Sequence, residues 1–92
     1  MQTEMKQLRP EVLRFALLME QRLCEKDEDK GSRWKSKTPA DLIVDTGLTA
    51  HRLMKSVTKN ETYKIVRHAI DLANYCMMVA DVSGSLESEG SK

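Results

Sequence analysis

The chain has 92 residues and a formal net charge of +1, with 15 Lys and Arg side chains against 14 Asp and Glu side chains. This balance argues against electrostatic binding of nucleic acid or of an anionic membrane, which requires a basic surface. A chain of this length makes one small domain that hides at most about 60% of its unfolded surface. A lone helical unit is therefore marginally stable, and we expect self-association.

Three features indicate a soluble, cytoplasmic protein. Residues 1–7 lack the apolar core of a signal peptide, and the longest apolar run, residues 76–80, is far too short to span a bilayer. Cys24 and Cys76 lie within apolar patterns and have no C-x-x-C spacing. This arrangement is typical of reduced, buried thiols and not of a disulfide or a zinc site.

A first helix is predicted from about residue 8 to Glu25. Pro10 suits a first turn because its missing N–H would be unbonded there, and Glu11 complements the helix dipole. The apolar stripe of this helix consists of Val12, Leu13, Ala16, Leu17, Met19 and Leu23. The run 25–33 has no apolar residue and contains Gly31, so it is predicted to be a frayed helix end followed by a loop.

Trp34, the only tryptophan, lies in this loop between charged residues. Large aromatic side chains usually bury apolar area, so the ring is expected to cover the gap between helices. A base-stacking role is the alternative. The two roles are compatible if the ring forms one wall of a pocket, and both remain open.

A second helix is predicted to start at Thr38, with Pro39 at the first helical position and Asp41 completing a capping box. Its apolar side consists of Leu42, Ile43, Ala50, Leu53, Met54 and Val57. Gly47 lies inside this pattern, and an interior glycine costs about 1 kcal/mol relative to alanine. We therefore expect either a distortion there or a close approach by another helix.

A third helix is predicted over residues 59–82. Thr58-Lys59-Asn60-Glu61 matches a capping box, which makes the connection short and the second and third helices an antiparallel hairpin. Residues 84–92 are polar, small and without periodicity, so they are predicted to be a disordered tail. The helical domain is therefore expected to span residues 1–83.

The third helix is expected to be central, because residues 66–81 are apolar around most of the helix circumference. Asp71 and Asn74 interrupt this surface on one face, with His68 one turn earlier. Burying an unpaired polar group costs roughly 2–7 kcal/mol, so this row must have partners. The candidates are a bond between His68 and Asp71, a cation from the second helix (Arg52 or Lys55), Mn²⁺ or Zn²⁺ on His68 and Asp71, or a ligand.

No phosphate-binding glycine loop, nucleophile elbow or Cys/His metal cluster is present. A site is therefore expected among polar residues on facing helices. Lys64 and Arg67, together with Lys55 and Lys59, form a basic group that either attracts phosphate or is an ordinary solvated face.

Residues 8–16, the loop Trp34, a helix beginning near Asp41 and, most specifically, Asp71-Leu72-Ala73-Asn74-Tyr75-Cys76-Met77-Met78-Val79-Ala80-Asp81 resemble the small MazG-like branch of the all-α nucleotide pyrophosphohydrolases. The resemblance covers roughly residues 8–82. It implies an all-α unit of three main helices that is completed by oligomerisation, as a dimer or a tetramer. It also implies Mg²⁺-dependent cleavage of nucleoside triphosphates to monophosphate and pyrophosphate, with metals held by E-x-x-E and E-x-x-D motifs on successive helices.

The match to these motifs is partial. Asp71 matches the aspartate of E-x-x-D and Asn74 the asparagine that often follows it, whereas His68 replaces the glutamate. Asp45 is the sole carboxylate where paired glutamates are expected. The candidate metal ligands are thus Asp71, Asp45 and His68, for Mg²⁺ or Mn²⁺, and the candidate ligand-binding residues are Asn74, Trp34, Lys64 and Arg67.

One or two carboxylates make a poor magnesium cage, because Mg²⁺ requires several oxygen ligands in an octahedron. Unless a neighbouring subunit supplies more, hydrolysis is expected to be weak or absent, and no catalytic residue is assigned. The resemblance then implies a protein that binds a nucleotide or a phosphorylated small molecule. The alternative is a non-catalytic helical protein that assembles into oligomers and acts through interactions.

Overall fold

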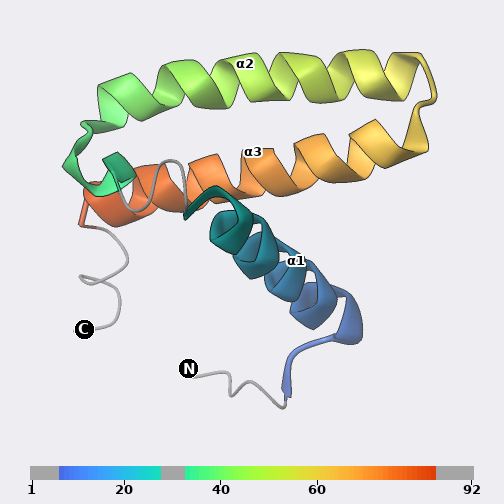
Figure 1. Ribbon diagram of the computed structural model, residues 1–92, viewed down its shortest axis with the longest axis horizontal. Coiled ribbons are helices and arrows are strands. Elements are labelled where there is room, and N and C mark those ends of the chain that lie inside the picture. Colours follow the sequence, from blue (N-terminus) through green and yellow to red (C-terminus); the bar gives the residue numbers. More distant parts are fainter. Residues whose placement is uncertain (1–6, 28–32, 85–92) are drawn as a thin grey trace.

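The computed structural model describes residues 7–27 and 33–84, and the regular secondary structure in these ranges consists of helices joined by short connections. The elements in chain order are α1 (Pro10–Asp27), the 3₁₀ helix η2 (Arg33–Ser36), α2 (Pro39–Thr58) and α3 (Thr62–Val82). Figure 1 shows α2 and α3 lying side by side and running in opposite directions. The predicted all-α class and the antiparallel hairpin are therefore confirmed.

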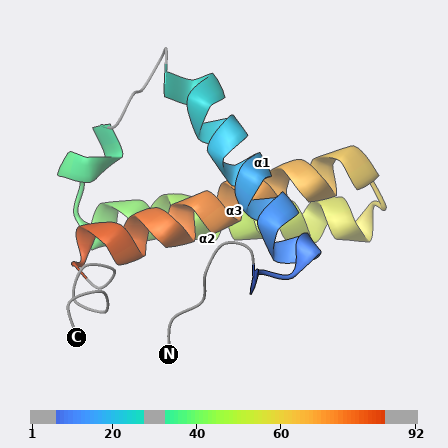
Figure 2. The same cartoon turned by 90° about the horizontal axis from the view of Figure 1, so that it is seen from below.

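The third helix is the centre of the fold. The other three elements all pack against α3, and α1 crosses it obliquely (Figures 1 and 2). The buried large apolar side chains of the described residues are Leu42 from α2 and Ile70 and Met78 from α3. This arrangement confirms that residues 66–81 belong to a helix packed on more than one side.

The first helix begins at Pro10, where the Arg9 carbonyl accepts a hydrogen bond from the Leu13 amide at 3.0 Å. It continues two residues past its predicted end, to Asp27. Residues 28–32, where the charged loop with Gly31 was predicted, lie outside the described residues, and so do residues 85–92 of the predicted tail. The third helix ends at Val82 as predicted, followed by Gly84 with a left-handed φ of +82°.

The start of α2 is the predicted capping box. The Asp41 amide donates to Thr38 Oγ1 at 3.2 Å, and the Thr38 amide donates to Asp41 Oδ2 at 3.3 Å. The first bond gives the Asp41 amide a side-chain acceptor beside the Thr38 carbonyl, to which it also donates at 3.1 Å, and the second satisfies the Thr38 amide. The cap therefore specifies the first residue of α2 locally.

The predicted capping box at Thr58 is wrong. Residues 56–61 instead end α2 with a Schellman motif, in which Asn60 has a left-handed φ of +58°. The Glu61 amide, which the box would require for Thr58, donates to the Ser56 carbonyl at 3.0 Å, and the Asn60 amide donates to Val57 at 3.0 Å. Thr58 Oγ1 donates back to the Met54 carbonyl, so α3 starts at Thr62 without a side-chain cap.

Gly47 neither distorts α2 nor permits a close approach. The helix continues through it, and a Cβ built at this position would have no heavy atom within 4 Å. Both expectations for this glycine are therefore wrong. Its position is exposed to solvent.

The predicted burial of the two thiols is also wrong, because Cys24 and Cys76 are exposed, although both are free as expected. Each cysteine follows by two positions a residue that faces a neighbouring helix, Arg22 and Asn74 respectively. Residues two apart in a helix lie on different sides, so both thiols face outward. Cys24 donates to Glu20 Oε2 at 3.3 Å, and this bond is the main cause of its raised thiol pKa.

None of the helices in the described part of the chain combines the length and hydropathy that a bilayer crossing requires.

We expect Thr38→Ala to lower the free energy of unfolding by about 1 kcal/mol, because it removes the side-chain acceptor of the α2 cap. Thr58→Ala is the matched control and should change stability by less than about 0.5 kcal/mol, since Thr58 is exposed and bonds only to a carbonyl of its own helix. Urea denaturation followed by circular dichroism measures both. Equal losses in the two variants would contradict this assignment of the caps.

Candidate functional site

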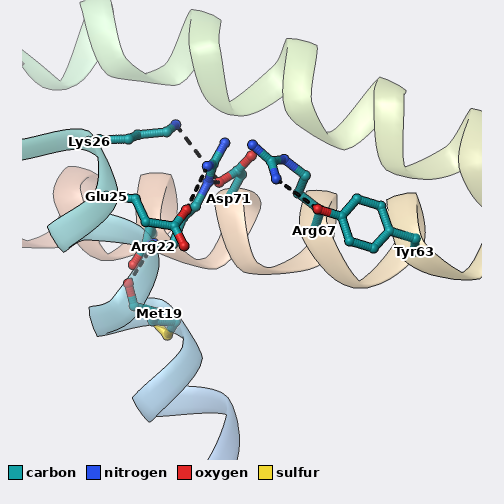
Figure 3. Close-up of polar contacts among 8 residues, drawn as sticks. Met19, Arg22, Glu25, Lys26, Tyr63, Arg67 and Asp71 are labelled. Carbon is teal, nitrogen blue, oxygen red and sulfur yellow. Dashed lines mark hydrogen bonds and ion pairs between the residues drawn. The ribbon is translucent and has the colours of Figure 1, made fainter. Parts of the chain in front are cut away.

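Asp71 is paired with cations from α1 (Figure 3). Arg22 Nε donates to Asp71 Oδ1 at 2.9 Å, and Lys26 Nζ lies 3.8 Å from the same oxygen. Only 13% of the Asp71 side chain and 18% of the Arg22 side chain are exposed, so solvent screens the pair weakly. The bond to Asp71 is the main cause of the raised pKa of Arg22, and a second bond, to Glu25 Oε1 at 3.1 Å, adds to it.

The partner of Asp71 thus comes from a helix that the sequence did not indicate. Arg52 and Lys55 of α2 were candidate cations, and His68 was a candidate partner on the same helix. Arg22 is 49 residues away in the chain and meets Asp71 only because α1 crosses α3 at this level.

Asn74 lies one turn further along α3 and is 4% exposed. Its Nδ2 donates to the carbonyl of Met19 in α1 at 3.2 Å. Its Oδ1 is the one buried side-chain nitrogen or oxygen in the described residues that has no hydrogen-bond partner. Buried polar atoms are nearly always paired in proteins, so this acceptor requires an explanation.

A cavity of about 330 Å³ lies where the four elements meet, beside Asp71 and Asn74. Its volume falls at the lower end of the roughly 300–1,000 Å³ range of small-molecule sites. Its walls are formed by Arg22, Leu23, Lys26, Arg33, Trp34, Lys37, Leu42, Asp45, Asp71, Asn74, Tyr75 and Met78. Residues 28–32 connect two of these walls and lie outside the described part of the chain.

The described walls carry an excess of positive charge. Four of the lining residues are cationic and two are acidic, an excess of two, although the whole chain has a net charge of only +1. The acidic groups are both close to cations, Asp71 to Arg22 and Lys26, and Asp45 to Lys37 at 3.9 Å. The cavity is therefore electrostatically suited to an anion.

Two aromatic side chains, Trp34 and Tyr75, line the same cavity. Lys35 Nζ lies 5.5 Å from the centroid of the Trp34 ring, and Lys26 Nζ lies 5.9 Å from that of Tyr75, both within cation–π range. Burial is the main cause of the raised pKa of Tyr75, and the nearby carboxylates of Asp45 and Asp71 raise it further. Tyr75 is therefore a neutral phenol at physiological pH.

The structure brings four of the seven predicted site residues together. Asp71, Asp45, Asn74 and Trp34 all line the cavity. His68, Lys64 and Arg67 do not: Lys64 pairs with Glu61 at 3.2 Å, and Arg67 donates to Tyr63 Oη at 3.1 Å (Figure 3).

The basic side chains of the cavity and Tyr75 were not among the site residues predicted from the sequence. Arg22 and Lys26 are spaced i, i+4 and therefore share one face of α1, a signal that was available. Arg33 and Lys37 flank Trp34 at short distance in the sequence, but nothing local indicates that they line a cavity. Tyr75 directly follows Asn74 in the most specific segment of the resemblance.

The described walls of this cavity offer two carboxylates, Asp45 and Asp71, which are fewer oxygen ligands than a Mg²⁺ ion usually takes from a protein site. Both carboxylates already neutralise cations of the protein, and Mg²⁺ binding usually relies on carboxylate oxygens that are open to the ion. The described residues contain no group of three or more His, Cys, Asp or Glu side chains placed to hold a metal ion.

Comparisons of the chain with protein-family models, with curated proteins and with solved structures found no match. The MazG-like resemblance therefore stays a prediction that rests on the residues quoted for it.

The Arg22–Asp71 pair should show strong energetic coupling in a double-mutant cycle. We expect Arg22→Met and Asp71→Leu each to lower the free energy of unfolding by roughly 2–4 kcal/mol, because each leaves a poorly solvated charge with fewer partners. The double variant should lose at least about 1 kcal/mol less than the sum of the single losses.

The exposed pair Glu61–Lys64 provides the control cycle, with side chains 38% and 59% exposed. Its coupling should be below about 0.5 kcal/mol. Urea denaturation measures all six variants, and equal coupling in the two cycles would show that the Arg22–Asp71 contact is an ordinary surface pair.

Proposed function

We propose that this protein binds a phosphorylated small molecule, with a nucleotide as the favoured class, in the cavity between α1, η2, α2 and α3. The observation that carries the proposal is the combination of excess positive charge with two aromatic rings around one cavity of ligand size. Lysine and arginine side chains supply the donors and the charge that phosphate oxygens require. Aromatic rings offer apolar faces on which a base can stack.

The ion pairs suggest which cations hold the helices together and which bind phosphate. Arg22 is committed to Asp71 and Glu25, so its guanidinium mainly holds α1 against α3. Lys26 comes from α1, and Arg33 and Lys37 come from η2 and the residue directly after it, so two segments of the chain bring cations to the cavity. A phosphate bound there would link these segments, and the interaction would weaken with added salt.

We propose binding without hydrolysis at this site. The pyrophosphohydrolase chemistry implied by the MazG-like resemblance needs several carboxylates around Mg²⁺, and the described cavity offers two that are already paired. We therefore expect binding that persists in the presence of a chelator. Pyrophosphate release that survives repurification and requires Asp71 would contradict this part of the proposal.

Calorimetric titration with the common ribo- and deoxyribonucleoside triphosphates, with Mg²⁺ or with a chelator, tests binding. We expect micromolar affinity for at least one nucleotide. The Lys26→Gln, Lys37→Gln double variant should weaken it by tenfold or more, because each lost phosphate contact contributes about 1 kcal/mol. Lys64→Gln is the matched control outside the cavity and should change affinity by less than about threefold.

Absence of binding to any nucleotide under these conditions would refute the proposal. So would a loss of affinity in Lys64→Gln as large as in the double variant, since that would indicate attraction by overall charge.

A second candidate function is assembly through a homo-oligomer, and exposed apolar side chains favour it. Ile43, Met54 and Val57 of α2 are 54%, 66% and 57% exposed, and they lie at helical spacing on one side of the helix. The described residues bury only three large apolar side chains, which is a small core for a stable domain. A second copy of the chain would cover this stripe and add to that core.

We expect the wild-type chain to sediment as a dimer or a larger species, and Met54→Asp to shift it towards the monomer. Lys55→Asp, at the next position of α2, is the control and should leave the mass unchanged. Analytical ultracentrifugation measures each variant. A monomeric wild-type chain at high micromolar concentration would exclude this second candidate.

A further inference from the structure

Asn74 is one of the residues that line the proposed binding cavity, and its buried Oδ1 has no hydrogen-bond partner among the described residues. The residue is 96% buried, so its Oδ1 has lost bulk water without gaining a donor from the described residues. The desolvation of such an atom is costly, and a native structure retains it where something else supplies the donor.

The orientation of the amide follows from its other hydrogen bond. Nδ2 donates to the Met19 carbonyl at 3.2 Å, and a carbonyl accepts only from a donor. Turning the amide over would place Oδ1 against that carbonyl oxygen, and two acceptors repel each other. The bond to Met19 in α1 therefore fixes the amide of Asn74, and Oδ1 has no donor among the described residues.

We propose that Asn74 Oδ1 accepts a hydrogen bond from an N–H or O–H group of the bound ligand, which makes Asn74 a specificity-determining residue of the cavity. This inference rests on the proposed function and deepens it. The cations attract any phosphate, whereas the acceptor selects ligands that carry a hydroxyl or amino donor at a fixed distance from the phosphate. The ligand class is therefore a nucleoside phosphate or a similar hydroxyl- or amino-bearing phosphate, and not inorganic polyphosphate.

The neighbouring charges are consistent with this division of roles. Asp71 lies one turn away on α3, and its negative charge is directed to Arg22 and Lys26. An acceptor oxygen beside a carboxylate disfavours a phosphate at that point and favours a donor. The phosphate end of the ligand is then expected towards Lys26, Arg33 and Lys37, and its hydroxyl or amino end towards Asn74.

The test compares inorganic tripolyphosphate with nucleoside triphosphates, which share the phosphate chain and differ in the donor groups. Calorimetry on the wild-type chain should give tenfold or greater preference for at least one nucleoside triphosphate. In Asn74→Leu this preference should fall by on the order of tenfold, while the affinity for tripolyphosphate changes by less than about threefold. Ser56→Ala, which removes a buried hydroxyl outside the cavity, is the control and should keep the preference.

A second series needs no change in the protein. For the preferred base, ribo-, deoxy- and dideoxynucleoside triphosphates and a base-methylated analogue remove the donor groups one at a time. Removal of the donor group that Asn74 binds should weaken the affinity of the wild-type chain by on the order of tenfold. The same removal should leave the affinity of Asn74→Leu unchanged. This double comparison holds even if Asn74→Leu is less stable, provided that circular dichroism shows it folded at the titration temperature.

The outcomes separate the two proposals. Failure of the wild-type chain to bind either nucleoside triphosphates or tripolyphosphate overturns the proposed function and this inference together. Equal affinity for both, or a preference that Asn74→Leu leaves unchanged, overturns the inference alone and leaves an anion site whose buried acceptor is satisfied by solvent.

Discussion

The fold depends on how the carboxylate of Asp71 is compensated. This side chain lies in the middle of the helix that packs against every other described element, where an unpaired charge is strongly disfavoured. Arg22 and Lys26 supply the compensation from α1. The pair therefore determines where α1 crosses α3, since a shift of one turn along either helix would separate the charges.

The cavity is a consequence of that crossing. The C-terminal part of α1 brings Arg22 and Lys26 to one side of α3, and η2 and the start of α2 bring Arg33, Trp34 and Lys37 to the same place. Acidic and basic residues are nearly equal in number over the whole chain, but basic side chains outnumber acidic ones around the cavity. The near-neutral charge of the chain gave no indication of this local excess.

The same geometry explains why we propose that the cavity binds a ligand but does not hydrolyse it. The Arg22 guanidinium stands beside Asp71, so the carboxylate that matches a metal ligand by sequence is used to hold two helices together. A pocket in which the acidic groups are already paired attracts anions. Asn74, held to Met19 by its amide nitrogen, adds a neutral acceptor to an otherwise cationic wall.

Local patterns in the sequence were sufficient for the helices, because apolar periodicity and the Thr38 capping box involve only residues within one or two turns. They also identified the polar row of α3 and Trp34. The Thr58–Glu61 stretch shows the limit of such patterns: a threonine and a glutamate three residues apart match a helix start. Asn60 adopts a left-handed conformation there and uses the same amide groups to end α2.

The sequence by itself determined that this chain is helical, that its third helix is central, and that Asp71 and Asn74 need partners, since these conclusions follow from spacing and desolvation. Only the tertiary structure decided which partners they have, which cysteines are exposed and which basic residues share a cavity. Those relations depend on the crossing of α1 and α3, which joins residues 49 positions apart, and no local pattern encodes that contact.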